Sequence, residues 1–253
     1  MVDMKGQIQS AEYQLPYHHF VDVDPFSLGF KSYKSVSFAL SYALGNLLVF
    51  REIKKLGPTS WCDVGCGDGA FICNFGRFLL DCKCVGFDYD PRAIRLANHV
   101  EPAGDFRSVD IVRDQIDQKF DVVTLVEVFE HIHPDNSEVF LQAAGRLVNP
   151  GGHLIITVPH VNQKMAEKHY RHFSIAELAD ICGQVLADFH VQAAFGFGRK
   201  SLLERVNKGL LQTKHLFLEM PWLNRVRLRR QLSAIPVDDR QAQQIFLHLK
   251  RSQ

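Results

Sequence analysis

The chain has 253 residues, of which 46% are hydrophobic and 23% are charged, and its formal net charge is +1. This length allows one sizeable core, and the near-zero net charge gives no support to a protein that binds nucleic acid or membranes through its overall charge. No uncharged apolar segment approaches the ~20 residues of a transmembrane helix, and the first residues lack the apolar stretch of a secretory signal. We therefore expect a cytoplasmic location.

Short β-branched segments alternate with helical patterns along the chain from Thr59, which indicates a parallel sheet covered by helices. The expected strands are 60–64, 83–88, 105–109, 120–126, 153–158, 188–194 and 244–250. The expected helices are 70–80, 92–98, 137–147 and 175–183. Ser174 and Glu177 form a capping box at the last of these helices, and an Asn-Pro-Gly-Gly segment at 149–152 separates the third helix from the next strand. The pattern predicts an α/β fold with a Rossmann-like, seven-stranded, mostly parallel, doubly wound sheet.

Two regions lie outside this alternation and predict helical additions at the N-terminal and C-terminal ends of the fold. We expect one or two helices at 35–55 and a helical region at 199–236. The predicted division is an N-terminal helical cap segment (1–58), a ligand-binding Rossmann-like core (59–198), a basic amphipathic helical insertion (199–236) and the last strand of the core sheet (237–253). Both additions are placed to cover the carboxyl edge of the sheet, where open α/β folds bind ligands.

A glycine-rich turn joins the first expected strand to the first expected helix. Gly65, Gly67 and Gly69 let the backbone turn sharply and approach a ligand closely. The turn also matches the dinucleotide pattern GxGxxA, but Asp63 and Asp68 would place two negative charges beside a pyrophosphate. A ligand with an ammonium group, a sulfonium and one carboxylate therefore fits this turn better than a dinucleotide does.

Acidic residues follow the next two strands as well. Asp88 lies 21 residues beyond Gly67, where a carboxylate accepts hydrogen bonds from both ribose hydroxyls of a nucleotide. Tyr89 is placed to lie along the adenine, and Asp110 after the third strand is placed to accept from an exocyclic amine. Each of these aspartates alone is equally consistent with a surface turn. Their occurrence at successive strand ends indicates one nucleoside site.

The order and spacing of these segments resemble the motifs of class I S-adenosylmethionine-dependent methyltransferases, of the type 11/12 kind. The segments that carry the resemblance are 63–69, 86–88, Asp110, 127–131 and 146–152, and it covers roughly residues 55–195. It implies that the 59–198 core binds S-adenosylmethionine. The implied cofactor residues are Asp63, Gly65, Cys66, Gly67 and Asp68 at the turn, Glu127 near the methyl group, Asp88 at the ribose, and Tyr89, Asp110 and Ile111 at the adenine.

The segment after the fourth strand carries the candidate catalytic residues. Glu130 and His131 follow Glu127 by one turn, on the side where the resemblance places the methyl acceptor. Methyl transfer needs in-line placement, exclusion of water and deprotonation of the acceptor, because the sulfonium is already activated. His131 is the candidate general base, since the pKa of histidine lies near neutrality.

The same residues also form a candidate metal site. Glu127, Glu130 and His131 combine with His172, which follows the fifth strand, into a set of two carboxylates and two imidazoles suited to Mg²⁺ or Mn²⁺. This set resembles that of small-RNA 2′-O-methyltransferases and, in part, of ubiquinone-type O-methyltransferases. A site without a metal is the alternative, and His160 and His169 are weaker candidate ligands.

Residues 199–230 are strongly basic in a chain that is otherwise slightly acidic. They contain nine Lys or Arg residues against Glu204 and Glu219, interleaved with leucines and Trp222. Such a segment predicts a phosphate-bearing acceptor, which could be RNA, a nucleotide sugar or a lipid-linked glycan, and peripheral membrane contact. A solvated basic face over an apolar lid is the alternative.

The sequence as a whole predicts transfer of a methyl group to oxygen of a small-molecule, glycan or lipid-linked acceptor, because the basic charge is local rather than general. A metal-dependent RNA 2′-O-methyltransferase and a non-catalytic S-adenosylmethionine-binding protein are the alternatives. A nicotinamide dehydrogenase is a more distant one. Nitrogen and carbon acceptors stay open.

Overall fold

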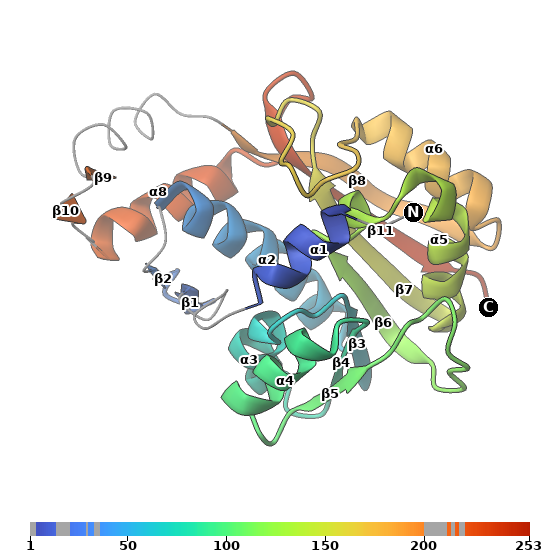
Figure 1. The fold of residues 1–253 in the computed structure, drawn as a ribbon. Coiled ribbons are helices and arrows are strands. Elements are labelled where there is room, and N and C mark those ends of the chain that lie inside the picture. The colour runs from blue at the N-terminus through green and yellow to red at the C-terminus, as the bar shows by residue number, and fades with distance from the viewer. Residues whose placement is uncertain are drawn as a thin grey trace.

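A seven-stranded sheet forms the centre of the computed structural model, which describes residues 4–13, 21–28, 30–32, 36–199, 212–213, 216–217 and 221–253. The strands are β3 (Ser60–Val64), β4 (Lys83–Asp88), β5 (Asp105–Ser108), β6 (Phe120–Val126), β7 (Val148–Pro159), β8 (Phe189–Arg199) and β11 (Ala242–Arg251). Their order is β5-β4-β3-β6-β7-β11-β8 (Figure 1). Strands β3 to β7 pair in parallel, and β11 lies antiparallel between β7 and β8. The predicted seven-stranded, mostly parallel sheet is confirmed.

The strand order reverses next to β3, and this reversal positions the site. From β3 the chain moves outward through β4 to β5, then returns to place β6 on the other side of β3. The loops that leave β3 and β6 therefore diverge in opposite directions. A crevice at such a switch point is where doubly wound sheets bind ligands.

Helices cover both faces of the sheet (Figure 1). The helices α2 (Val36–Leu56), α3 (Ala70–Phe75) and α4 (Pro91–Val100) supply one core cluster, and α5 (Ser137–Arg146) and α6 (Ile175–Val185) supply the other. Along β6, Val122 belongs to the first cluster and Val123 to the second, because successive side chains of a strand point to opposite faces. Because both faces of these strands are buried, their sequences are nearly continuous apolar segments.

Most expected helices and strands are present, with shifted ends. The expected helices at 35–55 form the single helix α2, whose Leu44 and Phe50 pack in the same cluster as Trp61. The helix expected over 70–80 ends at Phe75 and continues as a 3₁₀ turn, Gly76–Phe78. The capping box of Ser174 and Glu177 is confirmed at the start of α6.

The expected break at 149–152 is wrong, because β7 already begins at Val148. Val148 pairs with Phe120, whereas His153 pairs with Val122, so the Asn-Pro-Gly-Gly segment forms a bulge inside the strand. Gly151 has a φ of 75°, which glycine adopts without a steric penalty. A segment of Asn, Pro and Gly usually ends a strand. In β7 this segment bends the strand, and the pairing with β6 continues beyond it.

The ends of the chain outside the sheet are only partly helical. The N-terminal addition contains α1 (Met4–Ala11) and the antiparallel pair β1 (Val21–Val23) and β2 (Phe30–Ser32). Within 199–236 the prediction of helix is correct for α8 (Pro221–Ser233) and wrong for β9 (Gln212–Thr213) and β10 (Leu216–Phe217), which form a short antiparallel pair. The basic residues 200, 205, 208 and 214 lie outside the described residues. None of the helices in the described ranges has the length and apolar character needed to cross a membrane.

Candidate active site

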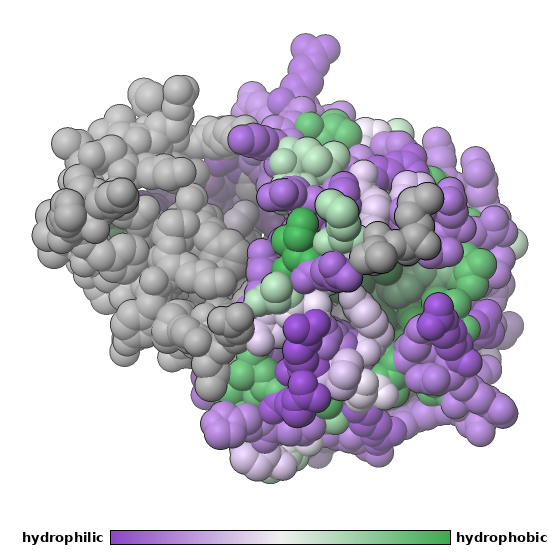
Figure 2. Space-filling view, viewed as in Figure 1, coloured by the Kyte–Doolittle hydropathy of each residue, from purple (hydrophilic) through white to green (hydrophobic). Residues whose placement is uncertain are grey.

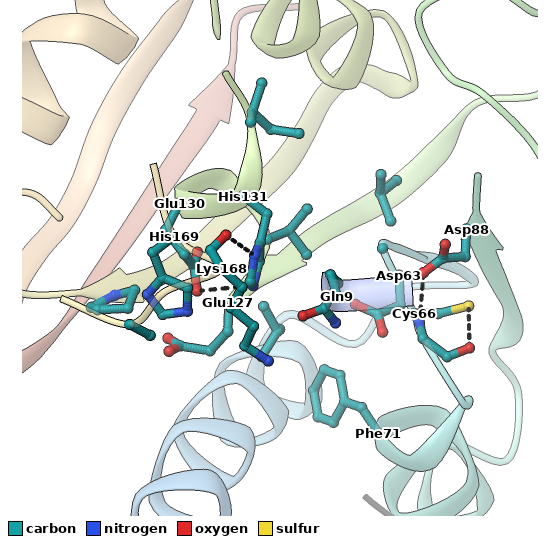
Figure 3. A pocket seen from close by; sticks show the side chains of 18 of the residues that line it. Gln9, Asp63, Cys66, Phe71, Asp88, Glu127, Glu130, His131, Lys168 and His169 are labelled. Carbon is teal, nitrogen blue, oxygen red and sulfur yellow. Dashed lines mark hydrogen bonds and ion pairs between the residues drawn. The ribbon is translucent and has the colours of Figure 1, made fainter. Parts of the chain in front are cut away.

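A cavity of about 1100 Å³ opens at the carboxyl ends of β3, β4 and β6. The loops after these strands line it from one side, and α1, α2 and the adjoining ends of β8 and β11 line it from the other. Helix α1 crosses the front of this edge of the sheet (Figure 1). In the view of Figure 3, Gln9 of that helix lies between one pair of acidic side chains, Asp63 and Asp88, and a second pair, Glu127 and Glu130. Most of the described surface on this side is hydrophilic, with smaller apolar areas (Figure 2).

The glycine turn forms one end of the cavity. Gly65, Gly67 and Gly69 have φ values of 74°, 56° and 75°, in the left-handed region that favours glycine. The backbone N–H groups of Gly65 and Cys66 both donate to the carbonyl oxygen of Phe87, at 2.7 and 3.0 Å, which ties the turn to the end of β4. The turn thereby presents bare backbone to the cavity, as a closely bound ligand requires.

Asp88 is buried beside this turn. Its carboxylate accepts hydrogen bonds from the backbone N–H groups of Gly67, at 3.0 Å, and Asp90, at 2.8 Å. Burial nevertheless raises the pKa of Asp88 to about 6, because few water molecules remain to stabilise the charge. A carboxylate fixed at the carboxyl end of the second strand, with oxygens facing the cavity, is suited to holding a ribose diol.

Asp63 lies at the end of β3 and also lines the cavity. The hydroxyl of Thr124 donates to its Oδ1 at 2.6 Å, but burial outweighs this bond and raises the pKa of Asp63 to about 7. A cationic ligand in the cavity would favour the ionised form of both carboxylates. The acidic end of the cavity therefore fits the ammonium group of S-adenosylmethionine.

The predicted adenine end is more open. Tyr89 is 60% exposed, whereas Ile111 is buried, and both line the cavity together with Asp110. Asp110 accepts a hydrogen bond from the backbone N–H of Val112 at 3.0 Å, which holds the loop after β5. Asp68 is different from the other predicted cofactor residues, because it is fully buried and does not belong to the cavity lining.

Glu127 begins the second acidic group, at the end of β6. Its φ of 55° is in the left-handed region, which costs free energy for a residue other than glycine. Its backbone N–H donates to the carbonyl oxygen of Thr157 at 2.9 Å, and this bond helps to hold the conformation. Burial raises the pKa of Glu127 to about 7, and among the described residues no group hydrogen-bonds its buried Oε1.

Glu130, His131 and His169 form a compact cluster behind Glu127 (Figure 3). One ligand atom from each lies within 4.8 Å of the others. Both carboxylate oxygens of Glu130 are buried without a hydrogen-bond partner among the described residues, and burial raises its pKa well above the usual value. Burial lowers the pKa of His131 to about 4 and that of His169 to about 3, so both rings are neutral at pH 7.

The cluster has the donor set of a divalent transition-metal site. A cation would satisfy the two orphaned oxygens of Glu130, and two neutral imidazoles suit Mn²⁺ better than Mg²⁺, which prefers oxygen ligands. The histidine that the structure places beside Glu130 and His131 is His169. His172 lies outside the cavity lining and hydrogen-bonds His169, with 2.8 Å between its Nε2 and the Nδ1 of His169.

Several lining residues had no signal of function in the sequence. The hydroxyl of Tyr13, just beyond α1, lies 3.5 Å from the Oδ2 of Asp88, although the two residues are 75 positions apart. Asn46 of α2 and Gln244 of β11 are buried in the cavity wall. A polar residue within an otherwise apolar helix or strand is the only sequence signal that could have identified the latter two.

The fold and the site define a class of protein, the class I S-adenosylmethionine-dependent methyltransferases. The magnesium protoporphyrin IX methyltransferase ChlM from Synechocystis PCC 6803, solved with bound S-adenosylmethionine, has a TM-score of 0.60 and 14% identity, covering 100% of this chain and 98% of its own. The N-methyltransferase NodS from Bradyrhizobium japonicum WM9 has a TM-score of 0.55 and 12% identity, and the match covers 85% of this chain and 97% of NodS. At these identities the likeness establishes the fold.

Sequence comparison gives the family. Residues 40–191 match a family model described as a methyltransferase domain, and the chain belongs to this family. The ubiquinone biosynthesis O-methyltransferase of Ralstonia nicotianae is 35% identical over 108 residues, which are 40% of this chain and 44% of that enzyme. The mitochondrial ubiquinone biosynthesis O-methyltransferase of Rattus norvegicus is 33% identical over 119 residues, 44% of this chain and 33% of that enzyme. The chain thus spans less than half the length of these relatives.

Proposed function

We propose that the chain transfers the methyl group of S-adenosylmethionine to an oxygen atom of a small-molecule, glycan or lipid-linked acceptor. The observation that carries the proposal is the presence of Glu130 and His131 in the same cavity as the glycine turn and Asp88. A methyl donor held at the turn would direct its sulfonium toward the end of β6. An oxygen acceptor must lose a proton as it is methylated, and a general base at this position performs that step.

The ring orientation of His131 supports its role as the base. Its Nδ1 lies 3.3 Å from the carbonyl oxygen of Lys168, so this nitrogen carries the hydrogen and the Nε2 lone pair is free. Burial lowers its pKa to about 4, so the ring is neutral at pH 7 and its lone pair is available to the proton of an acceptor hydroxyl, but it is a weaker base than the near-neutral pKa of free histidine predicts. In-line placement of the acceptor contributes roughly 7–11 kcal/mol of the lowering of the barrier, and the base contributes about 10²–10⁴-fold in rate.

A bound Mn²⁺ or Mg²⁺ is the finer part of this proposal. Glu130, His131 and His169 would hold the ion, and His172 would orient His169 through their hydrogen bond. Glu127, another predicted ligand, lies outside this set of three. When bound, such an ion lowers the pKa of a hydroxyl that it coordinates. The Nε2 atom of His131 serves either as ligand or as base, so a chelator that leaves activity unchanged would favour the metal-free base.

The acceptor class rests on the local charge and on the relatives. Both ubiquinone biosynthesis relatives are O-methyltransferases by name, which supports oxygen as the acceptor atom. Arg225, Arg229 and Arg230 are exposed on α8, and exposed basic residues favour a peripheral contact with an anionic membrane surface. An RNA acceptor is the second candidate, because the same arginines suit a phosphate backbone. The expected cytoplasmic location stays a prediction.

The test is binding followed by turnover. We expect S-adenosylmethionine and S-adenosylhomocysteine to bind the purified chain in calorimetry, and Asp88→Ala to weaken both by about 100-fold, because two ribose hydrogen bonds to a charged group are lost. Asp105→Asn, on the neighbouring strand but outside the cavity lining, is the matched control. Incubation with labelled methyl donor and cell extract then identifies the product. Undiminished affinity in Asp88→Ala would contradict the proposal, and manganese-dependent label in RNA would reverse the order of acceptors.

A further inference from the structure

The wall of the cavity away from the glycine turn ends in an exposed arginine whose backbone is held in place. Arg199 is the last residue of β8 and lines the cavity. The side-chain amide of Gln231, on α8, holds its backbone on both sides: Arg199 N–H donates to Gln231 Oε1 at 3.2 Å, and Gln231 Nε2 donates to the Arg199 carbonyl at 3.0 Å. Gln231 is only 7% exposed. A buried amide thus fixes the point from which the arginine side chain extends.

Arg199 belongs to the acceptor end of the cavity. Its neighbour Gly198 has a φ of 65°, and a Cβ atom built there would lie 3.8 Å from the Oε1 of Gln244. The side chain of Gln244 lowers the pKa of Glu127, which places it close to that carboxyl, and it accepts a hydrogen bond from the Ser41 hydroxyl at 3.0 Å. A continuous polar wall therefore runs from Glu127, beside the reacting groups, to Arg199.

The charge of Arg199 distinguishes it from the other cations of the cavity. Arg113 is paired with Asp110 at 3.6 Å, and Lys168 is paired with Glu12 at 2.7 Å. Lys5 donates to the carbonyl oxygen of His169. Within the described ranges, the guanidinium of Arg199 has no such partner, because its hydrogen bonds there are made by its backbone. Among the cavity-lining lysines and arginines that the structure describes, Arg199 is therefore the one whose charged group has no partner there.

A second donor lies in the same cavity. Asn46 of α2 is 1% exposed, and its Nδ2 atom is buried without a hydrogen-bond partner among the residues that the structure describes. A buried amide N–H needs a hydrogen-bond acceptor, and an oxygen atom of a ligand in the cavity would supply one. The lining of this wall is thus rich in hydrogen-bond donors, in contrast to the carboxylates of the cofactor end.

We propose that the methyl acceptor carries an anionic group, a carboxylate or a phosphate, and that Arg199 binds it. The planar guanidinium forms paired hydrogen bonds with either group, and a charge-assisted pair of this kind fixes orientation as well as affinity. The anion held by Arg199 would direct the opposite end of the acceptor along the polar wall toward Glu127 and His131. Arg199 is then the residue that determines acceptor specificity, and this inference rests on the proposed methyl transfer.

The experiment compares probes that share a dihydroxyphenyl ring and carry a carboxylate, a neutral ester or a phosphate. The chain loaded with S-adenosylhomocysteine is titrated with 3,4-dihydroxybenzoate, with its neutral methyl ester, and with 3,4-dihydroxyphenyl phosphate. We expect the anions to bind about 10- to 100-fold more tightly than the ester, and Arg199→Gln to remove this preference without changing the affinity for the ester. The tighter of the two anions identifies the natural group. Arg199→Lys should retain part of the preference, because it keeps the charge but loses the paired geometry.

Two further variants separate a local contact from a general effect of charge. Lys250→Gln removes a charge from an exposed residue near the opposite end of β11 and should leave all affinities unchanged. Gln231→Met removes the clamp on Arg199 and should reduce the preference for anions by less than Arg199→Gln does. Equal binding of acid and ester by the unaltered chain, or no binding of any of the three, would overturn the inference. Failure of S-adenosylhomocysteine to bind would instead overturn the proposed function.

Discussion

Most of the proposed cofactor half of the cavity comes from one stretch of chain, residues 63–111, to which Tyr13 is added beside Asp88, whereas the proposed acceptor half draws on α1, α2, β6, β8 and β11. In the first half, backbone hydrogen bonds fix the critical groups: Gly65 is tied to Phe87, and Asp88 to Gly67. In the second half, side chains from distant segments meet, as Ser41 of α2 does with Gln244 of β11. If the cofactor lies at the glycine turn as proposed, local backbone geometry binds the ligand that the family shares, and tertiary contacts bind the acceptor.

The largest expected effect is a loss of catalytic rate from a change in the acceptor half alone. We expect Glu130→Gln, which keeps the shape of the side chain and removes its ability to bind and release a proton, to lower kcat by about 10²–10⁴-fold, the range for a positioned catalytic group. The affinity for S-adenosylhomocysteine should change by less than about twofold, because Glu130 lies away from the glycine turn. The measurement is transfer of labelled methyl to the acceptor found in extract, beside calorimetry of the cofactor product.

Glu138→Gln is the control for this variant, because Glu138 is exposed on α5 and outside the cavity lining. Full activity in Glu130→Gln would remove the cluster at the end of β6 from the reaction. A parallel loss of cofactor affinity would mean that the two halves do not function separately.

The next largest effect is expected from a change at the glycine turn of the cofactor half, where the backbone conformation matters most. A Cβ atom at Gly65 would lie 2.5 Å from Cγ2 of Val128, and the φ of 74° is unfavourable for alanine. We expect Gly65→Ala to lower the free energy of unfolding by about 1–3 kcal/mol and to weaken cofactor binding. Adding Val128→Ala should restore part of the stability by making room, and chemical denaturation measures both variants.

Gly183→Ala tests whether the effect comes from the turn and not from loss of a glycine in general. Gly183 lies within α6, and a Cβ atom there would contact nothing within 4 Å. Alanine in a helix interior is favoured over glycine by roughly 0.5–1 kcal/mol, so this variant should be more stable than the unaltered chain. A Gly65→Ala chain as stable as the original would show that the turn tolerates a side chain.

The same contrast decides what the sequence could predict. The strand ends and the glycine turn were predictable, because hydrophobic periodicity and left-handed glycines are local properties of the chain. The position of Tyr13 over Asp88 was not, because it depends on how α1 packs across 75 residues of intervening chain. Asp68 and Asp63 occupy similar positions in the motif, yet only Asp63 faces the cavity, and the direction of a side chain within a tight turn is a three-dimensional property.

The acceptor half illustrates the same limit. His169 and His172 are three residues apart, and the predicted metal set contained His172, with His169 as a weaker candidate. The structure places His169 in that cluster, because Tyr170 donates its backbone N–H to the Glu130 carbonyl at 2.8 Å and so fixes the segment beside the end of β6. Such a contact between two loops leaves no trace in periodicity or composition.

The smallest expected effect is the pH dependence that the buried carboxyls of the cofactor half give to the stability of the chain. The pKa values of Asp63 and Asp88 are raised to about 7 and about 6, so in the folded chain these carboxyls hold protons that the unfolded chain releases near pH 4. Their protonated forms therefore stabilise the unliganded fold at low pH, and this contribution is lost as pH rises from about 4 to about 7. Heat denaturation of the unliganded chain should show the decline, and Asp63→Asn should flatten it.

Affinity for the cofactor should increase as pH rises, whereas stability decreases, because a ribose diol and cationic groups favour ionised carboxylates. At pH 5 a carboxyl with a pKa of about 6 is protonated in roughly ten molecules of eleven, so affinity for S-adenosylmethionine should rise about tenfold from pH 5 to pH 8 on account of Asp88 alone. Calorimetry in two buffers of different ionisation enthalpy would detect the proton released on binding. S-adenosylhomocysteine lacks the sulfonium charge and should give a shallower slope. An affinity independent of pH would mean that the buried carboxylates do not face the cationic groups of the ligand, and that only the backbone of the turn recognises it.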